Sequence, residues 1–596
     1  MLGFIRSIYC GNVNKIHMLN LADILQHYYT CVENKYKFPF RLMRRSSPNC
    51  LHTDIFDRKL ILGICFLFFL VIVVKSSWIA EDAYITLRTV DNFVHGFGLR
   101  WNVAERVQVY THPLWMFLLS LFYAITGDSF LMPILLGVVL SLVTVYFLGK
   151  KIAPSGLGIV FGIGLLTMSK AFIDYSTSGL ENSLTHLLLV LFYVFFFNHG
   201  ANGFTGRNLL ILSFITALGV LNRMDTLLLY FPSLVFVMYQ VLKRDDIFVV
   251  LKNVFIGFIP FVIWSGFSLL YYGFLFPNTA YAKLNTGIPQ FELVQQGMLY
   301  VLNSISWDPV TLFVIFTACV IAWCQKVWKI RFVMCAIVLY IIYVVKIGGD
   351  FMSGRFFAAP FLVAVVILTS IFEEKRKWMY VVFLIAFGLS ILSPRSPFRV
   401  DDNYTAGYGD NGLLYIPETG IADERGYFYQ HSGLLKIARD KQMPDFEWVK
   451  TGEKAMKEKD GGLVVGGAMG MFGFKAGPNV RILDLYALTD PLLARLSAIQ
   501  EDPTWAPLGE PAWRIGHFKR ALPEGYTETI SYGRSLFTDP YIATYYEILK
   551  SITQDQIFSV PRLVRVVKMN LGKYDYLLEE YEKRGVLKTE YKQSWG

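Results

Sequence analysis

The residues best suited to chemistry are an acidic pair, Glu81 and Asp82, that follows the first long apolar run of the chain. A carboxylate held near a membrane wall is poorly solvated, which raises its pKa and makes it a usable general base toward a hydroxyl group. A plainer interpretation is that Asp82 caps a helix or anchors it at the interface. Tyr84, Arg88 and His112 follow and could line a cavity beside the pair.

Isolated charges also occur at the ends of later apolar runs. They are Glu181, Arg223, Asp225, Lys283, Asp350 and Arg355. The basic members could neutralise a phosphate, to which arginine offers a forked contact. Structural interpretations compete with these roles. Glu181 suits the N-cap and first turn of a helix, and Asp225 suits either the start of a helix or one half of a buried ion pair. Asp350 follows two glycines, which predicts a tight turn.

The composition places these residues in a membrane protein. Of 596 residues, 54% are hydrophobic and only 17% are charged, whereas soluble domains carry about 25% charged residues. The net charge of +10 does not indicate nucleic-acid binding, because lysine and arginine fall in short clusters between apolar runs, without a basic stripe or a recognition motif. The seven cysteines include no C-x-x-C pair, so no metal site is predicted from them.

Eleven apolar runs are long enough, or nearly so, to cross a bilayer. They are Leu60–Val74, Leu131–Leu148, Leu157–Met168, Leu184–Phe197, Leu209–Leu221, Thr226–Leu242, Ile247–Tyr272, Val310–Cys324, Phe332–Val345, Phe356–Phe372 and Met379–Leu392. A further run, Leu114–Thr126, is predicted to lie along the membrane surface. If it crossed, Lys150 and Lys151 would fall outside, whereas a surface helix leaves every basic loop in the cytoplasm.

This topology places nearly every isolated acidic residue at a span edge on the outer face. The topology is assigned from lysine and arginine, because acidic residues contribute little to membrane orientation. The clustering of the acidic residues on one face is therefore an independent observation. Charges near membrane depth are costly and tend to line cavities that do work. The outer face is therefore the predicted active face.

Three regions are expected. Residues 1–59 form a cytoplasmic N-terminal extension, residues 60–392 form the transmembrane module with a first outer loop over 75–130, and residues 393–596 form an outer soluble α/β domain. Strands are predicted at Gly462–Val465 and Val480–Leu485, and helices at Ser432–Arg439 and Tyr541–Ile552. The glycines at 467, 470 and 473 lack the spacing of a dinucleotide-binding loop. No cofactor is predicted, and a divalent cation is left open.

Several blocks in order carry a resemblance to a known family. They are Glu81-Asp82-Ala83-Tyr84, Tyr110-Thr111-His112-Pro113-Leu114-Trp115, Ser178-Gly179-Leu180-Glu181, Asn222-Arg223-Met224-Asp225, Pro277-Asn278-Thr279 with Lys283, Gly348-Gly349-Asp350-Phe351 with Arg355, Asp484 to Pro491 with Arg495, and Gly516-His517-Phe518-Lys519. Together they resemble the GT-C superfamily of membrane glycosyltransferases, and most fully its bacterial arabinofuranosyltransferase group. The resemblance covers roughly Trp78 to Tyr526. Tyr486 departs from it, because relatives often carry glycine there.

The resemblance implies a GT-C-type bundle in the bacterial inner membrane, with its active site and C-terminal domain on the periplasmic side. It implies transfer of a sugar, arabinofuranose, from a polyprenyl-phosphate donor to a glycan or pilin-like protein acceptor. Asp82 becomes the leading catalytic residue, with Glu81 beside it. The implied substrate-binding residues are Tyr84, Arg88, His112, Glu181, Arg223, Asp225, Lys283, Asp350 and Arg355.

Two alternatives remain open. One is a transporter or flippase of a lipid-linked sugar, and the other is a different GT-C activity such as protein O-mannosylation. Transporters usually place coupling charges at mid-bilayer and show internal repeats. This chain shows no repeat, and its charges gather at one surface, so the sequence favours the transferase.

Overall fold

The computed structural model describes residues 48–199, 203–284, 286–399, 419–436, 443–458, 462–467, 469–500, 513, 515–585 and 588–589. Most of the predicted N-terminal extension, residues 1–59, therefore lies outside the described residues. From Arg58 onward the chain forms one unit. The division at residue 392 into a membrane module and a soluble domain stays a prediction.

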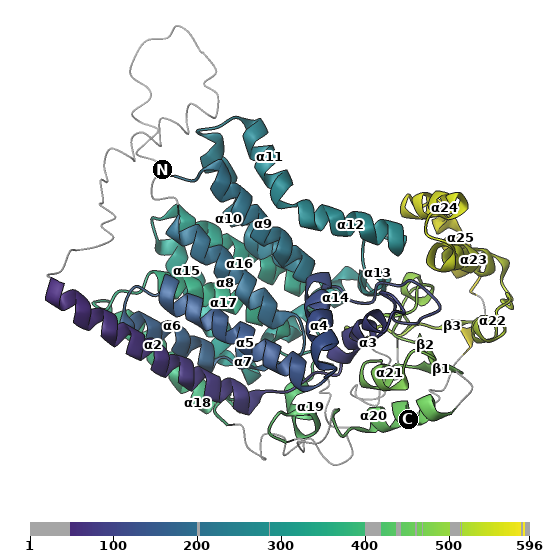
Figure 1. The fold of residues 1–596 in the computed structure, drawn as a ribbon, viewed down its shortest axis with the longest axis horizontal. Coiled ribbons are helices and arrows are strands. Elements are labelled where there is room, and N and C mark those ends of the chain that lie inside the picture. The colour runs from purple at the N-terminus through teal and green to yellow at the C-terminus, as the bar shows by residue number, and fades with distance from the viewer. Residues whose placement is uncertain are drawn as a thin grey trace, which may run out of the picture. The chain divides into compact units, whose positions relative to one another are not determined.

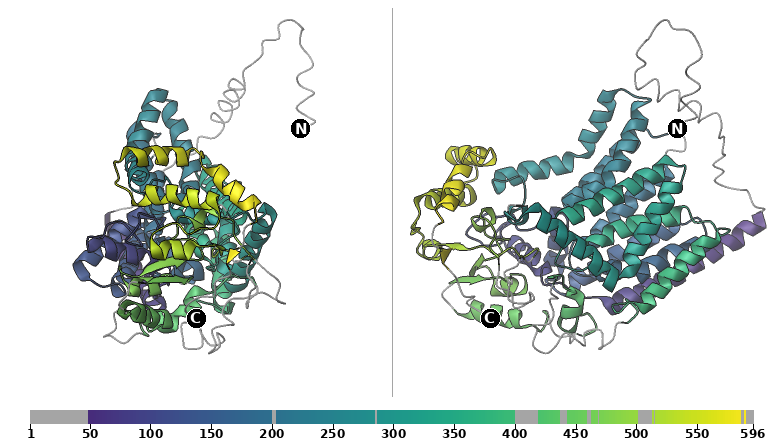
Figure 2. Two further views of the ribbon diagram at one scale, coloured as in Figure 1. Left: turned by 90° about the vertical axis from the view of Figure 1, so that its right-hand side faces the viewer. Right: turned by 180° about the vertical axis from the view of Figure 1, so that it is seen from behind.

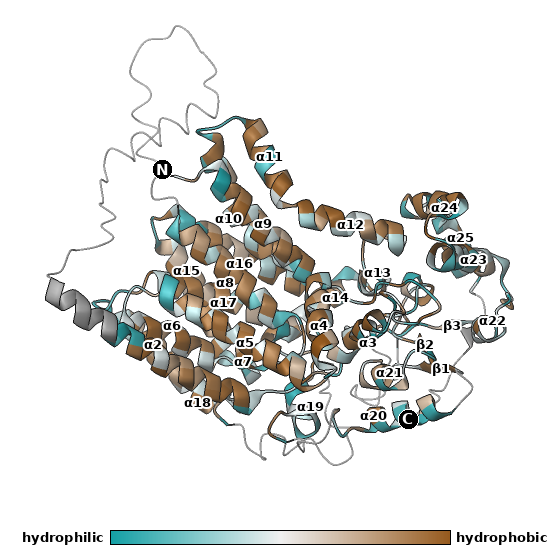
Figure 3. Ribbon diagram, viewed as in Figure 1, coloured by the Kyte–Doolittle hydropathy of each residue, from teal (hydrophilic) through white to brown (hydrophobic). Residues whose placement is uncertain are grey.

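Apolar helices side by side make up the body of this unit (Figures 1 and 3). They are α2 (Pro48–Ser76), α4 (Pro113–Thr126), α5 (Leu131–Phe147) with η2 (Leu148–Ile152), α6 (Gly156–Met168), α8 (Asn182–Asn198), α9 (Gly206–Asn222), η3 (Met224–Thr226) with α10 (Leu227–Leu242), α11 (Ile247–Gly257), α12 (Ile259–Tyr271), α14 (Gln290–Trp307), α15 (Pro309–Cys324), α16 (Trp328–Lys346), α17 (Arg355–Ser370) and α18 (Lys377–Leu392). Short helices α3 (Ala83–Val94), α7 (Lys170–Asp174) and α13 (Asn278–Leu284) lie between them.

Among the described residues, four helices are long and apolar enough to cross a membrane, or up to six if each of two bent pairs counts as one span. Six further apolar helices are shorter. Large apolar side chains such as Ile64, Phe248, Phe316 and Leu384 are exposed on them. Soluble monomers rarely expose so much apolar surface, so the chain is a multi-pass membrane protein. The count of eleven spans stays a prediction.

Two helix breaks were not foreseen. The single run predicted over 247–272 is two helices, α11 and α12, which bend by 56° at Phe258. Pro260 explains the break, because proline lacks an N–H group and its ring clashes with the preceding turn. The span predicted from Val310 is joined to an additional helix, α14, at a bend of 108°. Pro309 starts the second helix of that pair.

Helix α17 forms the centre of the bundle. Its residues from Phe357 to Thr369 are all buried, and it packs against α6, α7, α8, α15 and α16. A helix that is apolar all round has no face for solvent and is expected in such a place. Its first residue, Arg355, follows Gly354, which adopts a φ of +76°. The buried helix thus carries one charged group at its N-terminal end.

The surface helix predicted at 114–126 is α4. It packs against α3 and α9, and its other side exposes Phe117, Leu121 and Ile125. An apolar exposed side fits a helix that meets lipid. Its depth in the membrane stays a prediction.

The C-terminal region mixes short helices and strands (Figures 1 and 2). They are α19 (Glu424–Ser432), α20 (Glu447–Lys457), β1 (Leu463–Gly466), α21 (Met471–Ala476), β2 (Arg481–Asp484), η5 (Leu493–Arg495), β3 (Leu522–Pro523), α22 (Tyr526–Tyr532), α23 (Pro540–Gln554), α24 (Val560–Asn570), α25 (Asp575–Lys583) and β4 (Lys588–Thr589). Strands β1 and β2 pair in parallel, with Leu463 opposite Arg481, and β3 and β4 pair antiparallel.

Three of the four elements predicted in this region are confirmed. Strands β1 and β2 and helix α23 match the predictions over 462–465, 480–485 and 541–552. The helix predicted over 432–439 is wrong over residues 433–436, because α19 ends at Ser432 and these residues form a bridge and a turn; residues 437–439 lie outside the described residues. Gly433 pairs with Trp78 there, and Leu434 N–H donates to the Ser77 carbonyl at 2.9 Å. Pairing with the distant first loop replaces the local helix.

Candidate functional site

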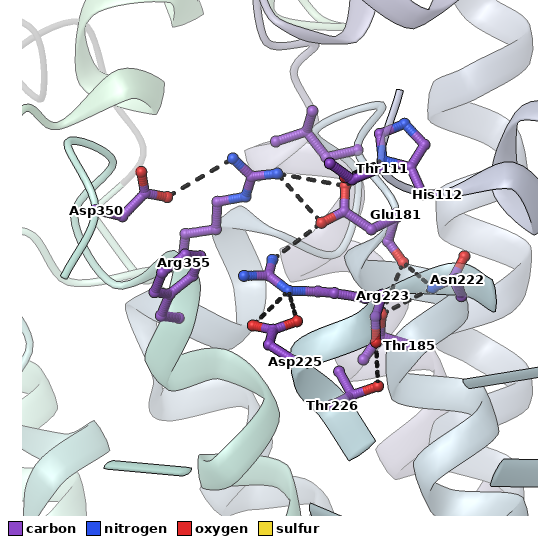
Figure 4. A network of polar contacts seen from close by, with 12 residues as sticks. Thr111, His112, Glu181, Thr185, Asn222, Arg223, Asp225, Thr226, Asp350 and Arg355 are labelled. Carbon is purple, nitrogen blue, oxygen red and sulfur yellow. Dashed lines mark hydrogen bonds and ion pairs between the residues drawn. The ribbon is translucent and has the colours of Figure 1, made fainter. Parts of the chain in front are cut away.

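Glu181 is the centre of a buried ion network (Figure 4). Its Oε1 accepts hydrogen bonds from Arg223 Nη1 at 2.9 Å and from Arg355 Nη2 at 3.2 Å. His112 Nδ1 lies 3.5 Å from its Oε2. Glu181 does occupy the N-cap of α8, as the structural interpretation expects, but its side chain makes no capping hydrogen bond. The carboxylate serves the two arginines instead.

The loop before α8 brings this network against the acidic pair. Ala80 N–H donates to the Ser178 carbonyl at 2.9 Å. Gly179 has a φ of +75°, and a Cβ there would lie within 3 Å of the Ile79 and Ala83 side chains. A side chain at this position would therefore push the two loops apart. The Gly179 carbonyl accepts a further bond from Trp115 at the start of α4.

Electrostatics fix the charge of the network. Burial alone would raise the pKa of Glu181, but the two positive charges of Arg355 and Arg223 hold it well below its usual range. Burial lowers the pKa of His112 to about 4, so this ring is neutral at pH 7. Its Nε2 lies 2.8 Å from Thr86 Oγ1 in α3. Glu181 is thus a charged anchor, and His112 links it to α3 without adding charge.

Arg223 and Asp225 form a buried pair, which is one of the two structural interpretations offered for Asp225. Arg223 Nε donates to both Asp225 oxygens at 2.8 and 3.0 Å, and its guanidinium lies 4.4 Å from the Phe356 ring. Tyr340 donates to Asp225 from α16 at 2.8 Å. Both side chains are held on several sides, so their first role is to support Glu181.

The predicted turn before Asp350 is confirmed. Gly348 and Gly349 adopt φ values of +91° and +74°, and a Cβ on Gly349 would lie 2.5 Å from the Tyr300 ring. Asp350 Oδ2 lies 3.6 Å from Arg355 Nη1. The Nε of Arg355 is buried and has no hydrogen-bond partner among the described residues. Arg355 thus joins two carboxylates and keeps one donor unused.

Asp82 faces this network and has no fixed partner. It occupies the N-cap of α3 without a capping hydrogen bond, and nothing in the described part of the chain pairs with its carboxylate. Burial raises its pKa, nearby Arg355 and Lys283 lower it, and nearby Asp350 and Glu181 raise it. The structure therefore brings together these four charges around the partly exposed Asp82 carboxylate. Lys283 is exposed on α13 and has no partner among the described residues.

Glu81 points the other way, into the C-terminal region. Its Oε1 accepts hydrogen bonds from the backbone amides of Gly470 at 2.5 Å and Met471 at 3.1 Å. A Cβ on Gly470 would lie 2.0 Å from the Glu81 carbonyl oxygen, so only glycine permits this approach. Burial raises the pKa of Glu81, the neighbouring Asp82 raises it further, and the two amides oppose them. The acidic pair is thus split between two surroundings.

Arg88 and Tyr84 do not join the charged network. Arg88 is buried, donates to the carbonyls of Trp101, Gly473 and Val480 at 3.0, 2.7 and 2.8 Å, and lies 4.3 Å from the Trp101 ring. Burial lowers its pKa to about 9. Tyr84 is also buried, with its ring 5.5 Å from that of Phe474. Both connect the loop that follows α2 to the C-terminal region.

A second buried ion cluster escaped the sequence reasoning. Lys170 bonds to Asp174 and, at 2.9 Å, to Asp423, while Arg425 lies 2.7 Å from Asp174. It holds the segment 419–436, which forms bridges to Met352 on one side and to Trp78 on the other. Those bridges lie next to the Asp350 turn and the acidic pair. The partners are about 250 residues apart in sequence, so no local pattern signals them.

The described residues include no group of three His, Cys, Asp or Glu side chains that could hold a metal ion. The carboxylates of the network face arginines, which compete with a cation for the same oxygens. The sequence left a divalent cation open, and nothing in this arrangement favours one.

Comparison with known proteins adds family evidence. Residues 111–264 match the family model described as dolichyl-phosphate-mannose-protein mannosyltransferase, a GT-C family. The chain is 27% identical over 542 residues to the terminal β-(1→2)-arabinofuranosyltransferase of Mycobacterium tuberculosis, covering 76% of this chain and 82% of that protein. It is 26% identical over 533 residues to the terminal β-(1→2)-arabinofuranosyltransferase of Corynebacterium glutamicum, covering 74% of this chain and 73% of that protein.

These matches agree with the ordered motifs. The matched family segment contains His112, Glu181, Arg223 and Asp225, and the two relatives cover about three quarters of the chain. The predicted enzyme class is therefore confirmed: the chain is a membrane glycosyltransferase, one segment of it matches a GT-C family model, and it is similar to the two terminal arabinofuranosyltransferases.

Proposed function

We propose that this protein transfers arabinofuranose from a polyprenyl-phosphate donor to a hydroxyl group of a glycan on the outer face of the membrane. The names of the two long relatives support the sugar. The unpaired Asp82 carboxylate, set among Lys283, Arg355 and two further acids, is the observation that carries the reaction.

Asp82 acts as the general base. A base must be ionised yet basic enough to accept a proton, and burial raises the pKa of Asp82 in that direction. It takes the proton of the acceptor hydroxyl while that oxygen bonds to the anomeric carbon. The bond between that carbon and the phosphate oxygen breaks, and its electron pair leaves with the lipid phosphate. Glu81 holds the backbone from which Asp82 projects.

Lys283 and Arg355 receive the departing phosphate. Lys283 is exposed and unpaired within the described residues, so it can gain a bond to phosphate without losing a protein contact, and Arg355 adds a second positive charge beside Asp82. Arg223 is already engaged with Asp225 and Glu181. We therefore do not assign Arg223 to the phosphate. In this proposal Arg223 supports Glu181, and Glu181 orients Arg355.

Asp82→Asn tests the mechanism. The amide keeps the size of the side chain but cannot accept the proton, so glycan transfer from labelled polyprenyl-phospho-arabinofuranose should fall by roughly 10²–10⁴-fold in isolated membranes. Asp245→Asn, an exposed acid between α10 and α11, is the matched control and should keep full activity. Transfer by Asp82→Asn within threefold of the parent would refute the base assignment.

A mannosyl donor is the second candidate, because the matching family model describes a mannosyltransferase. Parallel assays with polyprenyl-phospho-mannose separate the two sugars. Turnover with mannose and none with arabinofuranose would overturn the proposed donor while leaving the transferase class intact. Movement of labelled lipid across sealed vesicles without any glycan product would instead favour the flippase.

A further inference from the structure

Helix α24 carries an apolar stripe that nothing in the described protein covers. Val560, Val564, Val567 and Leu571 follow one another at intervals of four, three and four residues, which places them on one side of the helix. These four side chains and that of Phe558 are between 45% and 77% exposed. In a water-facing region such a stripe would be unfavourable, so its regular spacing indicates a surface that meets something apolar.

The opposite side of α24 is firmly packed. Arg562, Val566 and Met569 are buried, and Arg562 donates to the carbonyls of Ile552 at 2.8 Å and Tyr271 at 3.1 Å. Asn570 donates to the Gly273 carbonyl at 2.8 Å. These contacts fix the rotation of the helix, so the stripe is held outward rather than free to turn inward.

The same contacts place α24 at the end of a membrane helix. Tyr271 is the last residue of α12, which belongs to a bent apolar pair, and Gly273 lies so close that a Cβ there would be 2.3 Å from the Ile552 side chain. Figure 1 and the right-hand view of Figure 2 show α24 beside that end of α12. Val262, Ile263 and Leu270 of α12 are exposed and apolar as well. The stripe therefore continues a surface that faces lipid.

Charge around the stripe points to anionic lipid. From Gln556 to Tyr574 the chain contains four basic residues and no aspartate or glutamate; Arg562 is buried and Arg565 lies 3.8 Å from Asp555, which leaves two lysines for the headgroups. Lys568 is exposed beside the stripe and has no partner among the described residues, and Lys573 is exposed after the helix end. Long basic side chains that flank an apolar face reach the headgroup layer while the face enters the acyl boundary.

We propose that α24 is an interfacial anchor, whose Val560–Leu571 stripe inserts into the surface of the bilayer that holds the helical bundle and whose lysines bind anionic phospholipid headgroups. The anchor ties the C-terminal region to the membrane at the end of α12. It does not depend on the proposed sugar or on Asp82.

A photocrosslinking experiment on the full chain tests the proposal. A benzophenone amino acid replaces Val567 in one variant and Met456, an exposed apolar residue of α20, in the control. Both are reconstituted in nanodiscs that contain phosphatidylglycerol and are irradiated, and lipid adducts are quantified by mass spectrometry. Position 567 should give at least tenfold more lipid adduct than position 456. Equal yields, or adducts at 567 with a second copy or another protein in place of lipid, would overturn the anchor.

The headgroup contact has its own test. Lys568→Glu in the Val567 probe variant should lower the lipid adduct about fivefold in anionic nanodiscs and leave it unchanged in phosphatidylcholine nanodiscs. Lys457→Glu, an exposed lysine of α20, is the matched control. Neither lysine has a partner in the described structure, so the melting temperature of each variant should equal that of the parent. This measurement checks that the variants fold. If Lys568→Glu left the yield of lipid adduct in anionic nanodiscs unchanged, the role of Lys568 would be refuted.

Discussion

Two substitutions, Glu81→Gln and Glu81→Ala, test whether Glu81 positions Asp82 or transfers a proton itself. Glu81 accepts two backbone amide bonds through one oxygen, and the amide oxygen of glutamine can accept the same two bonds. Alanine loses both. An intramolecular hydrogen bond contributes roughly 0.5–1.5 kcal/mol, and Glu81→Ala loses two of them, so it releases the loop that carries Asp82. Glu81→Gln should keep kcat within about fivefold, whereas Glu81→Ala should lower it about 100-fold, the effect of a misplacement near 1 Å.

Gly470→Ala perturbs the same contact from the other side. The new Cβ would lie 2.0 Å from the Glu81 carbonyl oxygen, whereas ordinary van der Waals contact begins at 3.4 Å. Neither the Cβ nor the carbonyl oxygen can move without a shift of the backbone. One of the two segments must therefore move by more than about 1 Å, which again predicts a loss near 100-fold in kcat. Gly462→Ala is the matched control, since its Cβ would meet open space.

The assay is glycan transfer in reconstituted membranes with kcat and KM measured separately for donor and acceptor. A positioning role predicts that kcat falls while the donor KM changes little, because Lys283 and Arg355 stay in place. If Glu81→Gln were as inactive as Asp82→Asn, Glu81 would itself transfer a proton and the positioning argument would be wrong. Full activity of Gly470→Ala would contradict it equally.

Two further predictions concern the charges around Asp82. Lys283 lowers the pKa of Asp82, so Lys283→Gln should raise it and shift the acid limb of the kcat–pH profile to higher pH; an unmoved limb would mean that Asp82 is not the titrating base. Glu181→Gln leaves two buried arginines without their shared carboxylate and should destabilise the protein by about 3–5 kcal/mol, measured as a lower melting temperature at pH 7. Because the folded-state pKa of Glu181 is depressed, its contribution is present above the unfolded value near 4.5 and is lost on acidification, so the difference between Glu181→Gln and the parent should shrink below about pH 4.

Many of the helices could be predicted, because long apolar runs indicate segments that contact lipid. The two bends, between α11 and α12 and between α14 and α15, were harder to predict. Pro260 and Pro309 were visible in the sequence, but a proline can kink or simply begin a helix, and only packing decides between a kink of 56° and a turn of 108°. The failed helix at 432–439 shows the other limit. Its residues have helical pattern, yet pairing of Gly433 with Trp78 across more than 350 residues outweighs a local preference.

The acidic and basic residues at span edges were found because charges near membrane depth are unusual. Their grouping was also foreseen, and the structure does bring Asp82, Glu181, Arg223, Asp350 and Arg355 together. What sequence could not assign was the direction of each side chain. Glu81 and Asp82 are adjacent in sequence, yet one is bound by the C-terminal region and the other faces the arginines. Nothing in their local sequence distinguishes them, since the difference comes from Gly470, which is 389 positions away.

The charges also order the proposed reaction. In the protein alone, Arg355 and Lys283 lower the pKa of Asp82, which makes its carboxylate a weaker base. A donor phosphate bound to those same two cations offsets their charge at Asp82, and its own negative charge adds to that of Asp350 and Glu181. Each change raises the pKa of Asp82. Binding of the lipid donor therefore strengthens the base that the acceptor hydroxyl requires, and the proposed site favours deprotonation of the acceptor only after the donor is in place.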